Sequence, residues 1–149
     1  NNLRKNKTAI QKMKNILVLC TGNSCRSQIA EGYLKKFLKG RAVIYSAGTD
    51  NHQINKKAVN IMKEDGIDIS MHTSNNVLEY KDISFDFVIT VCDNANETCP
   101  TFLSKKAEKL HKNFFDPSSV TDPVRIESAY RECRDKIKRF CFDFSKKFN

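Results

Sequence analysis

The sequence predicts an α/β fold, a three-layer sandwich in which a central four-stranded parallel sheet is flanked by helices. Two observations predict it. Short, continuous apolar runs alternate along the chain with segments whose apolar residues recur every three or four positions, as expected for strands joined by crossover helices. The 149 residues are also 40% hydrophobic and 29% charged, a length and composition suited to one globular domain with a substantial core.

The first half of the chain contains two expected strands and two expected helices. The apolar run 15–19 predicts a strand covered on both faces, and 42–46 predicts a second strand. The segment 56–65 predicts a helix that ends before Gly66. Between the strands, one helical face ends before Gly40 and consists of Ile29, Tyr33, Leu34, Phe37 and Leu38.

The second half contains two further strands and a long final helix. Apolar runs at 85–91 and 109–115 predict the strands, and the polar stretch 70–81 is expected to hold a short helix. From Asp122 the chain is predicted to be helical to its end, with Pro123 in the first turn. The apolar stripe of this helix is typical of a core face, and it contains Ile126, Ala129, Tyr130, Cys133, Ile137, Phe140, Cys141, Phe144 and Phe148. Both cysteines are expected to act there as small hydrophobic residues.

Residues 1–14 are polar and lysine-rich, so we expect an N-terminal extension followed by a single domain over 15–149. No apolar run reaches the length of a membrane span, and the run NILVL is too short for a secretory signal. The six cysteines form no evenly spaced disulfide framework. We therefore expect a cytoplasmic protein without a membrane partner.

The formal net charge is +9, and the lysines are spread along the whole chain. This distribution is typical of a solvated surface that also attracts small anions. No nucleic-acid-binding signature is present, so no nucleic-acid partner is expected. A non-enzymatic basic module that binds anions or nucleic acid remains the alternative that charge alone leaves open.

Reactive side chains follow three of the expected strands: Cys20, Cys92 and Asp116. The carboxyl ends of parallel strands meet at one edge of a sheet, where such folds bind ligands. We therefore expect these three groups to converge on one rim. Asp116 precedes a proline, and an Asp-Pro pair is also a common start of a turn.

The bend between the first strand and first helix has the composition of an anion cradle. Backbone N–H groups and a helix N-terminus would attract an oxyanion, and Arg26 can bind it through two parallel hydrogen bonds. Cys20 would there be a thiolate nucleophile, with Ser27 donating a hydrogen bond to its sulfur. The expected substrate-binding residues are Thr21, Gly22, Asn23, Ser24, Cys25, Arg26 and Ser27.

The segment CTGNSCRSQIAEG, which starts at Cys20, resembles the signature loop of the low-molecular-weight protein tyrosine phosphatase superfamily. Four further matches follow in order: YSAG at 45–48, MKEDGIDIS at 62–70, VITVCDNANETCP at 88–100, and Asp116-Pro117. Within the superfamily, the sequence is most similar to thioredoxin-coupled arsenate reductases. The resemblance implies the phosphatase I-like fold, flavodoxin-like in appearance.

This resemblance implies reduction of arsenate to arsenite, with phosphate or sulfate as mimics of the substrate. Cys20 would attack arsenic, Arg26 would bind the anion and Asp116 would protonate the departing oxygen. A disulfide relay would then pass from Cys20 through Cys92 to Cys99, and thioredoxin would reset it. Glutathione with a glutaredoxin is the other candidate reductant, and no tightly bound cofactor is expected. The polar residues between Cys92 and Cys99 favour a segment that unwinds easily.

A low-molecular-weight tyrosine phosphatase is the alternative, because it would use Cys20, Arg26 and Asp116 alone. Two features argue against it. Cys92 and Cys99 would have no role, and the acid loop continues as Ser118-Ser119 without aromatic residues that flank a phosphotyrosine pocket. Weak phosphatase activity is compatible with the reductase.

Two further expectations come from the family. Cys25 either pairs with the nucleophile under oxidation or only packs within the loop. In some related reductases, residues matching Asn23, Glu31 and Ser46 help to hold a potassium ion behind the loop. A carboxylate of those proteins falls at Asn75 here, and the loss of that charge would weaken binding of the ion.

Overall fold

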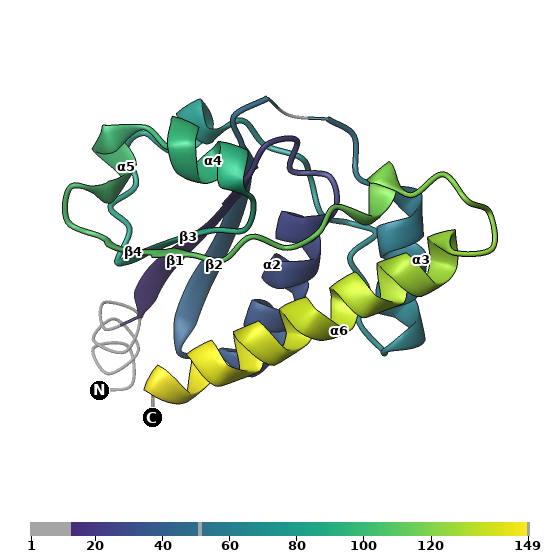
Figure 1. The fold of residues 1–149 in the computed structure, drawn as a ribbon. Helices are drawn as coiled ribbons and strands as arrows, with labels where there is room; N and C mark the ends of the chain where they lie inside the picture. The colour runs from purple at the N-terminus through teal and green to yellow at the C-terminus, as the bar shows by residue number, and fades with distance from the viewer. Residues whose placement is uncertain (1–12, 51, 149) are drawn as a thin grey trace.

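The computed structural model describes residues 13–50 and 52–148, without the side chain of residue 104. Its centre is a four-stranded sheet with the strand order β2-β1-β3-β4, in which every pairing is parallel. Figure 1 shows helices covering both faces of the sheet. The predicted fold class is confirmed. Of the predicted extension 1–14, all but Met13 and Lys14 lies outside the described residues.

The strand β1 (Lys14–Cys20) forms the middle of the sheet and ends at the anion loop. Its residues 16–19 are completely buried, as expected for an apolar run covered on both faces. It pairs with β2 (Ala42–Gly48), so that Cys20 lies opposite Gly48. On its other side it pairs with β3 (Phe87–Thr90), which brings Leu19 opposite Thr90.

Three helices pack against one another on one side of the sheet: α2 (Arg26–Phe37), α3 (Lys56–Glu64) and α6 (Ile126–Ser145). In Figure 1, the short helices α4 (Asp93–Thr98) and α5 (Thr101–Ser104) lie on the other side. Three 3₁₀ helices complete the described elements, namely η1 (Val77–Tyr80), η2 (Pro117–Ser119) and η3 (Lys146–Phe148). Cys133 and Cys141 are buried in the core face of α6, as predicted. None of the described helices combines the length and apolar composition that crossing a membrane requires.

Several element boundaries differ from the prediction, most of all those of the edge strand and the final helix. The edge strand β4 (Glu108–His111) is shorter than expected, because the regular strand pairing ends before Lys112. The N–H groups of Lys112 and Phe114 still donate to the carbonyl oxygens of Thr90 and Val91. The final helix starts at Ile126, and Pro123 lies in the turn before it rather than in its first turn. Asp122 begins that turn, because its side chain accepts a hydrogen bond from the N–H of Val124.

Candidate active site

The loop between β1 and α2 is held by the segment that follows β2. Four loop carbonyls accept backbone hydrogen bonds of 2.7–3.3 Å from this segment. The pairs are Thr49 to Cys20, Asp50 to Thr21, His52 to Gly22, and Asn55 to Ser24. Among the described residues, no N–H group from Thr21 to Arg26 donates to a backbone carbonyl. The loop carbonyls bond to the segment 49–55, and the loop N–H groups are therefore available to bind an anion at the start of α2.

Gly48, at the end of β2, allows the loop to approach this closely. A Cβ atom there would lie 2.5 Å from the carbonyl oxygen of Thr21, so only glycine fits without moving the loop. The sequence places Gly48 only in the YSAG match, after the expected strand 42–46, and the contacts of residues 49–55 were not predicted. A glycine directly after a buried strand, opposite a loop cysteine in a parallel sheet, was the available signal.

Asn23 fixes the centre of the loop from within. It has a left-handed backbone with φ of 48° and is completely buried. Its Oδ1 accepts hydrogen bonds from Ser27 Oγ at 2.7 Å and Gln28 Nε2 at 3.2 Å. The expected hydrogen bond from Ser27 to the Cys20 sulfur is therefore wrong, since the Ser27 hydroxyl is used to hold the loop backbone.

Arg26 reaches from the first turn of α2 toward the Asp116 loop. Its Nη1 donates to the carbonyl oxygen of Phe114 at 2.8 Å, and its Nη2 lies 3.9 Å from Asp116 Oδ2. Asp116 precedes η2, and its Oδ1 accepts hydrogen bonds from both the N–H and the hydroxyl of Ser118. The arginine and the carboxyl group thus lie on the same rim as Cys20, as predicted.

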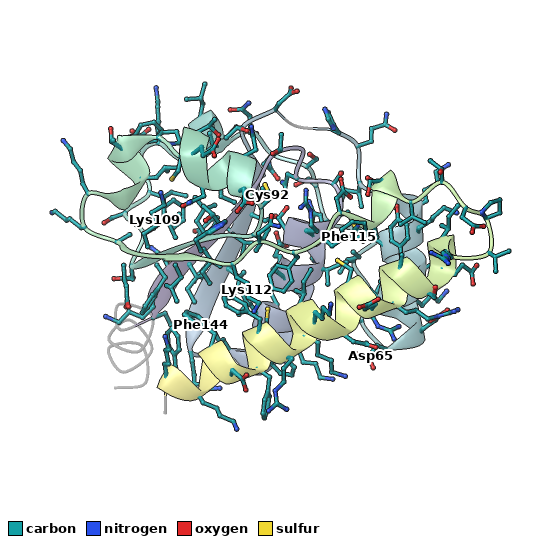
Figure 2. All side chains as sticks on the ribbon, viewed as in Figure 1. Asp65, Cys92, Lys109, Lys112, Phe115 and Phe144 are labelled. Carbon is teal, nitrogen blue, oxygen red and sulfur yellow. The ribbon has the colours of Figure 1, made fainter. Side chains whose placement is uncertain are left out.

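The sulfur atoms of Cys20 and Cys92 lie 3.6 Å apart. Cys92 directly precedes α4, and its Sγ also accepts a hydrogen bond from the N–H of Ala95 and contacts Thr21 Oγ1 at 3.4 Å each. Figure 2 shows Cys92 beneath α4 at this end of the sheet. The contact between Thr21 and Cys92 was not predicted, because the strand order that makes β1 and β3 neighbours cannot be read from sequence.

The two sulfurs influence each other's ionisation. The hydrogen bond from Cys20 lowers the pKa of the Cys92 thiol to about 5, assisted by Thr21 and the Ala95 N–H against the effect of burial. The same bond, together with burial, raises the pKa of Cys20, while Arg26 opposes the rise. The two thiols therefore titrate as a coupled pair, in which loss of a proton is easier from Cys92 and harder from Cys20.

Cys99 directly follows α4, at the opposite end from Cys92. It is half-buried, and burial raises its pKa, with Lys109 opposing the rise. Seven residue steps in a helix span about 10 Å, so Cys92 and Cys99 are too far apart for a disulfide in this arrangement. The segment expected to be loose is thus a helix, which must unwind before these sulfurs meet.

Cys25, in the same loop, is 6% exposed. Burial raises its pKa, and the nearby Cys133 and Asp116 add to the rise. Unlike the sulfur of Cys20, which bonds to that of Cys92, the Cys25 sulfur forms no hydrogen bond with the described residues, which supports the packing role of the two that were considered.

The residues expected to hold potassium do not fit that ion as arranged. Asn23 Oδ1 already accepts two hydrogen bonds, and its buried Nδ2 is a donor without a partner among the described residues. Glu31 Oε1 accepts from Ser46 Oγ at 2.6 Å, and its Oε2 lies 2.7 Å from Lys35 Nζ and 3.2 Å from His72 Nδ1. Glu31 lines a cavity of about 190 Å³ together with Lys35, His72 and Asn75. The Lys35 ammonium group therefore already balances the carboxylate at the place that a cation would occupy.

Known proteins resemble this chain both in sequence and in structure. A family model described as low molecular weight phosphotyrosine protein phosphatase matches residues 15–149. Arsenate reductase 2 of Staphylococcus epidermidis is 43% identical over 129 residues, which cover 84% of this chain and 91% of that protein. A solved arsenate reductase in an oxidized state has a TM-score of 0.81 at 26% identity and covers 92% of this chain and 100% of its own. Another, in a phosphate-binding state, has a TM-score of 0.74 at 27% identity with the same coverage.

Proposed function

The chain belongs to the low molecular weight phosphotyrosine protein phosphatase family, and from this premise we propose that it is an arsenate reductase with an internal disulfide relay. One observation carries the proposal: the sulfur of Cys92 lies 3.6 Å from that of Cys20. A hydrolase needs one nucleophilic cysteine, whereas reduction of As(V) needs a second sulfur that takes over the bond to the first. The 43% identity with an arsenate reductase supports the same choice.

The first step is attack by Cys20 on bound arsenate. The loop N–H groups and Arg26 bind the anion, and the Cys20 proton passes to Cys92 along the bond between the sulfurs. A bond forms between Cys20 Sγ and arsenic, and one arsenate oxygen leaves as water after Asp116 protonates it. Asp116, 3.9 Å from Arg26, lies on the side of the loop where this oxygen would depart.

The second step transfers two electrons to arsenic. Cys92 first releases to water the proton that it took from Cys20. Its thiolate then attacks Cys20 Sγ, so that an S–S bond forms, the S–As bond breaks and arsenite leaves with the electron pair. The Ala95 N–H still donates a hydrogen bond to the Cys92 thiolate after Cys20 has bound arsenic. Cys99 then attacks Cys92 and releases Cys20 as a thiolate. An external dithiol protein, which we propose is thioredoxin, reduces the resulting Cys92–Cys99 disulfide.

Weak phosphatase activity is a second proposed activity, because Cys20, Arg26 and Asp116 form a set sufficient for phosphate esters. The two serines after Pro117 bond to Asp116 itself rather than forming an aromatic wall for a phosphotyrosine ring. We therefore expect slow hydrolysis of small aryl phosphates only. We further propose a cytoplasmic location, which the six free cysteines support. We also propose that the relay works without a tightly bound cofactor.

The test is arsenate turnover with NADPH, thioredoxin reductase and thioredoxin, with glutathione and glutaredoxin as a parallel arm. Cys20→Ser should abolish all activity. Cys92→Ser should release no arsenite but retain slow hydrolysis of para-nitrophenyl phosphate. Cys99→Ser should stop with a Cys20–Cys92 disulfide detectable by peptide mapping. Rapid ester hydrolysis without arsenate-dependent NADPH oxidation in either arm would instead favour the phosphatase.

A further inference from the structure

Alternate residues of the edge strand and its continuation contact α4. His111 Nε2 lies 2.8 Å from Asp93 Oδ1, and the N–H of Asp93 donates to Asn113 Oδ1 at 3.1 Å. Lys109 Nζ donates to the carbonyl oxygen of Asn96 at 3.3 Å. Positions 109, 111 and 113 share the face of an extended chain, so one side of this strand binds both turns of the short helix.

Residues on the opposite side of the strand face α6 instead. Leu110, Lys112 and Phe114 line a cavity of about 930 Å³ against α6. Figure 2 shows Lys109 on the α4 side of the strand and Lys112 on the α6 side. His111 is further fixed on the α4 side by Thr90 of β3, whose Oγ1 lies 2.7 Å from His111 Nδ1. The side chain that contacts Asp93 is therefore itself anchored in the sheet.

The helix α4 has to satisfy two opposing requirements in the proposed relay. It must be folded against the sheet edge for Cys92 to lie 3.6 Å from Cys20. It must be unwound for Cys99 to reach Cys92, since the helix holds these two residues about 10 Å apart. Contacts that hold α4 closed therefore favour the first sulfur exchange and oppose the second.

We propose that Asp93, His111, Asn113 and Lys109 form a latch that positions Cys92 for attack on Cys20 and delays its capture by Cys99. This inference rests on the proposed function. None of the four side chains touches substrate, so they are positioning residues. In the step that the latch delays, Cys99 thiolate bonds to Cys92 Sγ while the Cys20–Cys92 bond breaks and Cys20 leaves as a thiolate, with no net oxidation.

The test compares Asp93→Ala with Glu97→Ala. Both changes remove one exposed acidic side chain from α4, but Glu97 forms no side-chain hydrogen bond or ion pair with the described residues. Amide hydrogen exchange of residues 93–98 is first measured in the reduced protein without substrate. Because an exposed ion pair contributes little, we expect exchange about two- to fivefold faster in Asp93→Ala than in Glu97→Ala.

The two exchanges are then timed in single turnovers with arsenate by acid quench, alkylation and peptide mapping. In a Cys99→Ser background, Asp93→Ala should form the Cys20–Cys92 disulfide more slowly than Glu97→Ala. With Cys99 present, Asp93→Ala should convert that disulfide to Cys92–Cys99 faster. A purely structural defect would slow both steps.

Equal amide exchange and equal step rates in the two variants would overturn the latch while leaving the reductase proposal intact. An absence of arsenite from the wild-type protein would refute the proposed function instead. In that case faster exchange in Asp93→Ala would still show that the contacts hold α4 closed, whereas unchanged exchange would reject the latch as well.

Discussion

At the scale of single residues, the pair of sulfurs at the ends of β1 and β3 sets the chemistry of the site. Their hydrogen bond over 3.6 Å couples the ionisation of the two thiols. Arg26 favours charge on either sulfur, the Thr21 N–H favours it on Cys20, and the Ala95 N–H favours it on Cys92. The location of the thiolate can therefore change as the substrate arrives and as the first bond forms.

Removal of the Cys92 sulfur should lower the pKa of Cys20. The hydrogen bond with Cys92 is the largest cause of the raised Cys20 pKa, and Arg26 would then act with less opposition. The rate of Cys20 alkylation by iodoacetamide against pH should show a lower midpoint in Cys92→Ala than in the wild-type protein. Cys99→Ala is the control and should leave that midpoint unchanged. A midpoint that rises in Cys92→Ala would contradict the coupling of the two thiols.

Gly48→Ala should impair the anion loop without unfolding the sheet. The added methyl group would lie 2.5 Å from the Thr21 carbonyl oxygen, so the loop must shift away from β2. We expect phosphate affinity, measured by calorimetry, to fall by about tenfold or more, since a displacement near 1 Å has large effects on bound geometry. Val43→Ala, in the same strand but near its other end, should bind phosphate normally. Normal affinity in Gly48→Ala would show that the loop does not depend on this close approach.

At the scale of elements, α6 contributes packing rather than redox chemistry. Cys133 and Cys141 are 5% and 0% exposed, and burial raises the pKa of both thiols. Cys133→Ala and Cys141→Ala should each lower the free energy of unfolding by about 0.5–1.5 kcal/mol, comparable with losing one buried methyl group. Arsenate turnover should stay within about twofold of wild type at a temperature where the variants are folded. A complete loss of turnover in a folded variant would give these sulfurs a chemical role.

The contact of His72, before η1, with Glu31 of α2 should make the free energy of unfolding depend on pH. Burial lowers the pKa of His72, opposed by Glu31 and assisted by Lys35. The unfolded chain therefore binds a proton more readily, and this contribution to stability is lost as the pH falls below the unfolded value of about 6.5. Chemical denaturation between pH 7.5 and 5.5 should show a smaller loss of stability in His72→Gln than in wild type. Identical slopes would mean that His72 is not held neutral.

At the scale of the whole molecule, much of the fold follows from local patterns. The run that becomes residues 16–19 of β1 is typical of a strand buried on both sides, because all of its side chains are apolar. The strand-end rule then places Cys20 correctly, whereas β4 ends at His111 and Asp116 follows five residues later. The helical spacing of apolar residues in α2 and α6 identifies the core faces. These features depend on the spacing of apolar residues, which can be read from a single sequence.

The remaining features depend on contacts between distant segments. The sequence 93–98 is polar enough for a loop, and it forms α4 where β4 and its continuation offer Lys109, His111 and Asn113 to bind it. Ser27 follows both Cys20 and Asn23 in the loop, and the left-handed turn at Asn23 decides its partner. The meeting of Cys20 with Cys92 requires β1 and β3 to be neighbours, which depends on the strand order rather than on either motif.

The most direct test of the central claim is a single turnover without any external reductant. Fully reduced, oxygen-free protein is mixed with equimolar arsenate, and both the arsenic species and the thiol state of each cysteine are measured. We predict one arsenite per protein molecule, loss of two free thiols and a single disulfide between Cys92 and Cys99. Arsenite formed while Cys92 stays a free thiol, or no arsenite from protein that binds phosphate normally, would contradict the relay.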